Sequence, residues 1–171
     1  MQNGTYQEIQ LRNIRMEDFN TVLKWSNNER FCSANDWSLE RTEEEVYTWW
    51  KKCVTTKNDH FVRLGIEIHS KLIGYADLAY IHREHQSAEI GIAIGETNMW
   101  SKGFGTQAVK KLMQYGHKQF GITSFLAETH ETNIRAQKML NRLGFQEISR
   151  NGSERYLNEE TTLIQYQFLV E

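Results

Sequence analysis

The segment from Glu96 to Thr106 precedes a predicted helix and holds residue types that can bind an anion. Gly103 and Gly105 allow the backbone to adopt positive φ and to approach a ligand closely, and Lys102 adds a positive charge. The first amide groups of a helix have no partner within it, and its dipole is positive at that end. Together these features favour binding of a phosphate or a similar anion.

Two known phosphate-binding patterns compete for this segment. The pattern GxxxxGK[ST] does not fit, because no Lys-Ser or Lys-Thr pair opens the helix. The dinucleotide pattern GxGxx[GA] is formally met from Gly103 to Ala108, and Glu128 follows 20 residues after Ala108. Its position argues against it, since about seven loop residues separate the glycines from the preceding strand and antiparallel strands come first.

The period of the apolar residues predicts the elements around this loop. Alternation over 62–68 and 72–81, with a turn near Ser70, predicts an antiparallel hairpin. Weaker alternation predicts a first strand over 6–13, and Glu128 falls in a further predicted strand. Helices are predicted after Phe19, from the capping box of Thr42 and Glu45, and from Gly105 to Phe120. These elements predict a sheet that begins with antiparallel strands, together with several helices.

A third strand of that sheet is predicted over 88–95, directly before the loop. It places three isoleucines on one face, and Glu89 with the small residues Gly91 and Ala93 on the other. We expect the small face to let a ligand approach the backbone closely, and Glu89 to point into the same cleft.

The composition excludes several classes of protein. A chain of 171 residues with 39% hydrophobic residues fits one domain, taken as 1–171. A net charge of −2 with scattered basic residues argues against nucleic-acid binding. No stretch reaches the ~20 apolar residues of a membrane span, and the N-terminus does not resemble a signal peptide, so a cytoplasmic protein without membrane contact is expected. Cys32 and Cys53 lack metal-ligand spacing, which predicts free thiols and no metal site.

Several motifs extend over residues 9–170 in a fixed order. The loop Trp100-Ser101-Lys102-Gly103-Phe104-Gly105-Thr106 resembles the pyrophosphate loop [RQ]xxGx[GA] of the GNAT N-acetyltransferases. It is most similar to the branch of ribosomal-protein N-terminal, spermidine and aminoglycoside 6′-N-acetyltransferases. The other matching segments are Leu11-Arg12 with Asp18, Ile73-Gly74, Ala88-Glu89-Ile90-Gly91-Ile92, Asn133-Ile134-Arg135-Ala136 and Leu143-Gly144-Phe145.

The resemblance implies an α/β (α+β) GNAT fold, with a mixed, largely antiparallel central sheet flanked by helices. It also implies a site for acetyl-CoA as cosubstrate, where the strands at 88–95 and 124–130 part. The pantetheine arm would bond to the backbone of Ile92, Ala93 and Ile94, as an added strand does. Trp100 stands where the family has Arg or Gln. The remaining residues expected to bind the cofactor are Ser101, Lys102, Gly103, Phe104, Gly105 and Thr106 through the loop, Asn133 near the thioester, and Arg135 and Lys138 near the 3′-phosphate.

The implied reaction is direct transfer of acetyl to a primary amine, which must first lose a proton. Glu89 is the first candidate base and His130 the second. The family's usual Tyr acid is replaced by Leu140, which leaves Ser101, Tyr80 and Tyr166 as candidate proton donors.

The acceptor is left open among a protein N-terminus, a polyamine and an aminoglycoside-like amine. We expect it between the helical segment 26–50 and the last strands, with Trp37, Trp49 and Trp50 as walls and with Glu40 and Glu43 favouring a polycation if they face it. A homodimer is also left open. The alternative function is an acyl-CoA-binding module without turnover, which the missing Tyr would fit.

Overall fold

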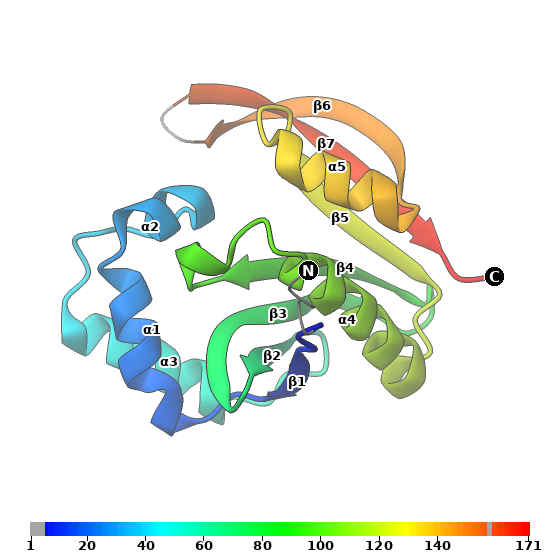
Figure 1. The fold of residues 1–171 in the computed structure, drawn as a ribbon. Helices are drawn as coiled ribbons and strands as arrows, with labels where there is room; N and C mark the ends of the chain where they lie inside the picture. Colours follow the sequence, from blue (N-terminus) through cyan, green and yellow to red (C-terminus); the bar gives the residue numbers. More distant parts are fainter. Residues whose placement is uncertain (1–5, 157–158) are drawn as a thin grey trace, which may run out of the picture.

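The computed structural model describes residues 6–156 and 159–171, and within them seven strands form one open sheet (Figure 1). The strand order is β1-β2-β3-β4-β5-β7-β6. This confirms the predicted mixed, largely antiparallel sheet flanked by helices. The strands are β1 (Gln10–Asn13), β2 (Val62–Ile68), β3 (Lys71–His82), β4 (Ser87–Ile94), β5 (Ser124–His130), β6 (Gln146–Tyr156) and β7 (Glu159–Leu169).

The pairing between β4 and β5 divides this sheet into two halves. It is the parallel pairing in a sheet whose other neighbouring strands are antiparallel. It consists of three residue pairs and ends at Glu89 and Leu126. Both strands continue beyond that point, β4 to Ile94 and β5 to His130, and Figure 1 shows them diverging. The edge of β4 that faces β5 therefore has no strand partner past Glu89.

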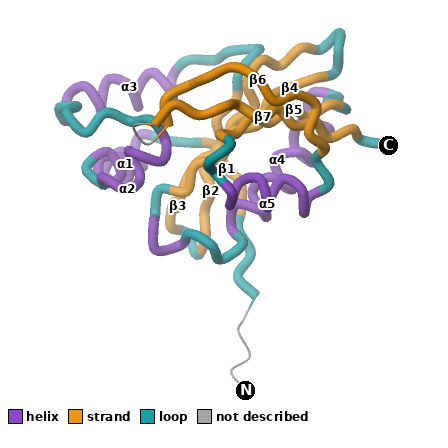
Figure 2. Tube along the Cα trace, turned by 90° about the horizontal axis from the view of Figure 1, so that it is seen from above, coloured by secondary structure: helices purple, strands orange, loops and turns teal. Residues whose placement is uncertain are grey.

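Helices cover the two faces of the sheet in separate groups. Adjacent strand residues point to opposite faces, and Tyr75 and Ala76 of β3 belong to two different clusters of buried side chains. The Ala76 cluster includes residues of α4 and α5, and the Tyr75 cluster includes residues of α1, α2 and α3, which Figure 2 shows apart from α4 and α5. The helices are α1 (Phe19–Ser26), α2 (Glu29–Asn35), α3 (Glu43–Thr55), α4 (Phe104–Phe120) and α5 (Ile134–Leu143), with short 3-10 helices η1 (Met16–Asp18) and η2 (Thr97–Met99).

Local signals in the sequence explain where these helices begin. The hydroxyl of Thr42 accepts from the Glu45 amide at 3.2 Å, and the Glu45 carboxylate accepts from the Thr42 amide at 2.7 Å, which confirms the capping box. Asn133 Oδ1 accepts from the Ala136 amide at 3.1 Å and caps α5. Within the described residues, no helix is both long and apolar enough to cross a membrane.

The first strand is shorter than predicted because the residues before it bond to α4 instead. Gln107 Oε1 accepts from the Ile9 amide at 3.1 Å, and its Nε2 donates to the Gln7 carbonyl at 2.9 Å. Strand β1 then starts at Gln10. Arg12 in this strand forms a bidentate pair with the buried Asp18, at 2.7 and 2.9 Å. The segment Leu11-Arg12 with Asp18, which matches the family, therefore has a structural role.

Gly95 directly follows the last residue of β4, and the backbone there passes over the buried indole of Trp25. A Cβ atom built on Gly95 would lie 2.0–2.5 Å from ring atoms of Trp25, which is 2% exposed. No side chain fits there unless the Trp25 ring moves out of the core.

We therefore expect Gly95→Ala to lower the free energy of unfolding by about 1–3 kcal/mol, measured by urea denaturation. Gly91→Ala in the same strand is the control, because its added Cβ would lie 3.7 Å from Asp77 Cβ, an ordinary contact. Equal stability of Gly95→Ala and wild type would contradict this packing.

Candidate functional site

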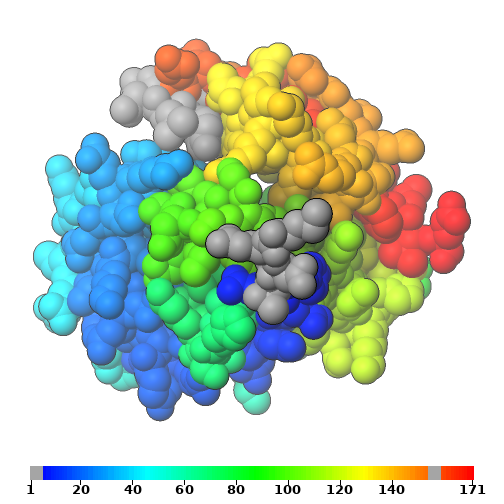
Figure 3. Space-filling view, viewed as in Figure 1, coloured from blue at the N-terminus to red at the C-terminus, as the bar shows by residue number. Residues whose placement is uncertain are grey.

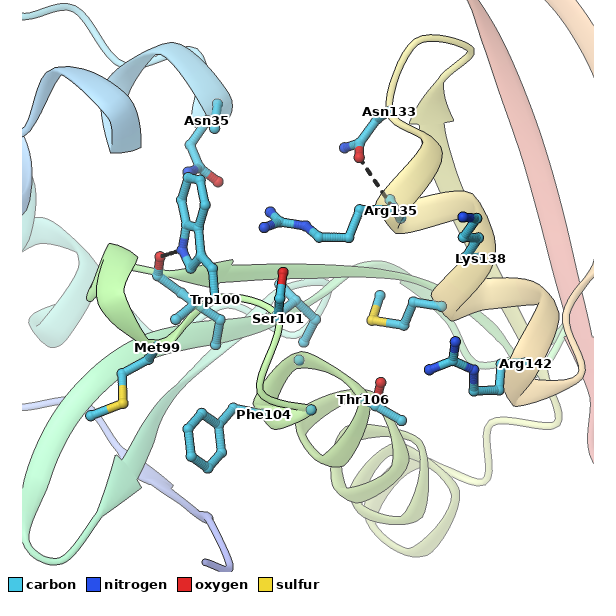
Figure 4. Close-up of a pocket in the computed structure, with 17 residues that line it drawn as sticks. Asn35, Met99, Trp100, Ser101, Phe104, Thr106, Asn133, Arg135, Lys138 and Arg142 are labelled. Carbon is cyan, nitrogen blue, oxygen red and sulfur yellow. Dashed lines mark hydrogen bonds between the residues drawn. The ribbon is translucent and has the colours of Figure 1, made fainter.

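A cavity of about 410 Å³ lies where β4 and β5 part, between the loop before α4 and the exposed side of α5 (Figure 4). In the space-filling view the surface is hollowed between the green segment near residue 100 and yellow α5 (Figure 3). The cavity combines the end of one strand with the start of two helices. Its lining residues are Ala34, Asn35, Ile92, Ile94, Met99, Trp100, Ser101, Gly103, Phe104, Gly105, Thr106, Asn133, Arg135, Ala136, Lys138, Met139 and Arg142.

The start of α4 presents its amides at one wall of this cavity. Gly103 is the N-cap, with φ 87 and ψ 2, and no side chain caps the first turn. A Cβ on Gly103 would meet no atom within 4 Å, so the left-handed backbone alone disfavours a side chain there. The following first-turn residues Phe104, Gly105 and Thr106 all line the cavity. Amide donors and the positive end of a 17-residue helix therefore face one point.

Three cations of α5 form the opposite wall. Arg135, Lys138 and Arg142 follow at helical spacing and all line the cavity, whereas no Asp or Glu does. In the described part of the chain, none of the three forms an ion pair. The cavity is therefore positively charged. Sequence reasoning missed Arg142, although its place seven residues after Arg135 on the same helix face could have indicated it.

The strand face that borders the cavity is the opposite of the expected one. Ile92 and Ile94 line the cavity, whereas Ala93 is 5% exposed and buried among α1, α2 and α3. The small residues accommodate the neighbouring strand, since Ala93 pairs with Tyr75 and Gly91 with Asp77, which binds Arg63. The small side chains of β4 thus serve packing. Lys102 of the loop is exposed and also lies outside the lining.

Glu89 does not point into the cavity, because it belongs to the same face as Gly91 and Ala93. It lies half-buried where β4 and β5 form their last pair. Burial raises its pKa, and the negative charge of Glu128 on β5 raises it further. Glu128 accepts a hydrogen bond from Gln165 Nε2 at 3.2 Å. A carboxylate with raised pKa thus stands at the parting point, on the side of the sheet away from the cavity.

The other candidate acid–base residues differ in burial and in whether they line the cavity. His130 ends β5 outside the cavity lining, and its carbonyl accepts from the Asn133 amide at 2.9 Å. Ser101 lines the cavity within the loop. Tyr166 is 2% exposed in the core, and Tyr80 is 78% exposed outside the lining, so neither reaches the cavity. Leu140 is buried in the same core and supplies no proton.

The expected aromatic walls of an acceptor site are only partly present. Trp50 is fully buried and donates its Nε1 to the Arg15 carbonyl at 3.0 Å, so it cannot line a groove. Trp49 lines an open depression with Ser38, Glu40, Arg41 and Glu45. Arg41 lies 6.0 Å from the Trp49 ring centroid, and Glu45 serves the helix cap, so this depression carries both signs of charge. Glu43 does not line it.

The site shows no arrangement for a metal, since no three His, Cys, Asp or Glu side chains of the described residues lie close enough to hold an ion. Cys32 and Cys53 are free, and burial raises the pKa of both thiols.

Several solved structures share this fold. A spermidine N-acetyltransferase from Vibrio cholerae, in complex with CoA and spermine, covers 95% of each chain with a TM-score of 0.82 and 20% identity. A ribosomal L7/L12 alpha-N-protein acetyltransferase in complex with coenzyme A covers 95% of this chain and 94% of that one, with a TM-score of 0.83 and 15% identity. A microcin C7 self-immunity acetyltransferase, in complex with acetyl-CoA and AMP, covers 95% and 93%, with a TM-score of 0.82 and 21% identity. At these identities the likeness concerns the fold.

Proteins related in sequence extend the comparison from the fold to the family. The uncharacterized N-acetyltransferase YoaA of Bacillus subtilis is 30% identical over 139 residues, 80% of this chain and 78% of that protein. The uncharacterized N-acetyltransferase p20 of Bacillus licheniformis is 37% identical over 76 residues, 44% of this chain. The matched segments span only 42% of that protein and 32% of an uncharacterized protein of Methanocaldococcus jannaschii. Residues 8–146 match the acetyltransferase (GNAT) domain, and the chain therefore belongs to the GNAT acetyltransferase family.

Proposed function

We propose that this protein transfers the acetyl group of acetyl-CoA to a primary amine by direct attack. The observation that carries the proposal is the cavity itself, where uncapped helix amides face three cations without an acidic neighbour. Such a site suits a polyanion, and the diphosphate and 3′-phosphate of acetyl-CoA supply one. We assign the diphosphate to the amides from Ser101 to Thr106, and Arg135, Lys138 and Arg142 to the phosphate groups.

The unpaired edge of β4 supports the next part of the assignment. The pantetheine arm is a chain of amides, and a strand edge without a partner offers it main-chain hydrogen bonds. The main-chain groups of successive strand residues point to opposite edges, and the Ala93 carbonyl lies toward Gly74 of β3. We therefore assign the main-chain bonds beyond the last β4–β5 pair to Ile92 in place of Ala93. The carbonyl of Ile94 already accepts from Trp100 Nε1 at 2.8 Å, so we assign Ile94 an apolar contact instead. Asn133 caps α5 through Oδ1, which leaves its amide group to bond the arm.

The proposed reaction takes place where the strands part. A protonated amine cannot attack a thioester, so a base must first take its proton, directly or through water. Glu89 lies at this point on the face away from the cavity, where the amine would enter, and we propose it as the base. A main-chain amide of β4 would stabilise the oxyanion of the tetrahedral intermediate, whose nitrogen is still protonated after the attack. Collapse to the amide breaks the carbon–sulfur bond, and the leaving thiolate takes up a proton from solvent or the one that this nitrogen loses. His130 is the second candidate base. Ser101 lies in the loop assigned to phosphate, and we propose it as a ligand there.

The acceptor class rests on the named relatives and on simple chemistry. One of them is named for spermidine and another for the N-terminus of a ribosomal protein, and both acceptors present a primary amine. We propose that class for this chain, as an enzyme of the cytoplasm. The buried Leu140 favours an acyl-CoA-binding module as the second candidate, because no Tyr acid is present. Release of free thiol from acetyl-CoA with a panel of polyamines, aminoglycosides and peptides decides between them, since the module would bind acetyl-CoA without releasing thiol.

Gly103→Val is expected to weaken acetyl-CoA binding by about tenfold or more, because a β-branched residue resists positive φ and shields the amides. Isothermal titration calorimetry measures the dissociation constant. Gly121→Val is the matched control at the far end of α4, with φ 68 and no atom within 4 Å of its Cβ. If Gly103→Val binds acetyl-CoA as tightly as both Gly121→Val and the wild-type protein, the phosphates bind elsewhere.

A pH profile tests Glu89 as the base. Burial and the charge of Glu128 both disfavour its ionised form, so the acid limb of kcat/KM should lie above the ordinary pKa of a glutamate. Glu128→Gln removes the repulsion and should shift this limb to lower pH. Glu89→Gln should reduce the rate by about 10²-fold or more and abolish the limb, while Glu131→Gln, a control at an exposed ion pair with Arg150, leaves it in place. An unchanged limb in Glu89→Gln would assign the base to another residue, with His130 next.

A further inference from the structure

Trp100 is the large aromatic residue that opens the loop before α4, and its ring is fixed in place. Its side chain lines the cavity, and the indole Nε1 donates to the Ile94 carbonyl at the end of β4 at 2.8 Å. A hydrogen bond from the ring edge to the strand leaves the faces of the indole free for other contacts. Figure 4 shows this bond, with α2 and α5 on either side of the ring.

Two guanidinium groups from distant parts of the chain meet on this ring. The Cζ atom of Arg30, on α2, lies 4.6 Å from the ring centroid of Trp100. The Cζ atom of Arg135, on α5, also lies 4.6 Å from it. Both distances are within the range in which an indole attracts a cation. Figure 4 shows the Arg135 side chain reaching from α5 toward Trp100 across the cavity.

Neither arginine has an acidic partner within the part of the chain that the structure describes. Two positive charges gathered at one ring repel each other, and the indole offsets only part of this repulsion. A bound phosphate would offset the rest, and the planar fork of a guanidinium bonds to two phosphate oxygens at once. Arg135 lines the cavity directly, whereas Arg30 is not among the lining residues and lies 4.6 Å from the centroid of the Trp100 ring, which does line the cavity.

We propose that Trp100 is a positioning residue, whose indole holds the guanidinium groups of Arg30 and Arg135 where they bind a phosphate group of acetyl-CoA. The inference rests on the proposed function, because it takes the anion of the cavity to be that cosubstrate. It assigns a role in cofactor binding to Arg30, which lies 70 positions before Trp100. It also explains how this loop is positively charged although Trp100 itself carries no charge, since the charge comes from the two arginines at its ring.

Calorimetric titration with CoA tests the proposal on Trp100→Leu, Trp100→Phe, Arg30→Met, Arg135→Met and the double variant Trp100→Leu/Arg135→Met. We expect Trp100→Leu and Arg135→Met each to weaken CoA binding about tenfold, and Arg30→Met about threefold. Trp100→Phe keeps an aromatic face and should stay within about threefold of wild type. The double variant should bind no more than about threefold more weakly than either single variant, because both changes remove the same contact.

Arg83→Met is the matched control, since Arg83 also lies over an aromatic ring, 5.3 Å from the centroid of Phe120, but that ring, unlike the ring of Trp100, does not line the cavity. It should leave CoA affinity unchanged. Titration with 3′-dephospho-CoA then identifies the phosphate. If the pair binds the 3′-phosphate, the effect of Trp100→Leu disappears with this ligand, and if it binds the diphosphate, the effect persists.

Two results would overturn the inference. One is a Trp100→Leu protein that binds CoA as tightly as wild type. The other is a double variant in which the two losses multiply, which would mean that Trp100 shapes the cavity without acting through Arg135. Should Trp100→Leu not fold, as judged by circular dichroism, Arg30→Met and Arg135→Met carry the test, and CoA affinity unchanged from wild type in both would overturn the inference. Absence of CoA binding by the wild-type protein would instead refute the proposed function, so the two failures are distinguishable.

Discussion

The short parallel pairing of β4 with β5 is the constraint on which the rest of the site depends. Three residue pairs hold the two halves of the sheet together, and the strands then diverge. Antiparallel partners on the outer sides continue past that point, since β3 pairs with β4 as far as Ile94 and β7 pairs with β5 as far as His130. Divergence therefore creates an opening in the sheet without unfolding either strand, and it leaves one edge of β4 with main-chain groups to satisfy.

Charge is distributed unequally across this opening. On one side lie the start of α4 and the cations of α5, with no carboxylate among the residues that line the cavity. On the other side Glu89 and Glu128 lie on neighbouring strands. Burial and the negative charge of Glu128 both raise the pKa of Glu89. A polyanion is thus favoured on the first face and a cationic amine on the second. The two faces of the sheet therefore favour ligands of opposite charge, and they meet where the strands part.

Features set by local interactions could be predicted from the sequence, whereas features set by tertiary packing could not. The capping box of Thr42 and Glu45 and the hairpin follow from short-range patterns, and the structure has them where expected. Alternation in β4 predicted two different faces, but it could not tell which face the helices α1–α3 would cover. The meeting of Arg30 with Trp100 joins residues far apart in the chain, and no periodic pattern encodes it. Trp50 was misplaced for a related reason, since a buried indole and a groove wall have the same spacing on a helix.

The side chain of Gln107 substitutes for a missing strand neighbour. It bonds to one main-chain amide and one main-chain carbonyl in the segment before β1, one position after the last residue of the loop that lines the cavity. Residues 7–9 are therefore attached to the first turn of α4, whose amides face the cavity. The position of this helix start and the path of the chain into β1 are coupled, because displacing either one breaks both hydrogen bonds.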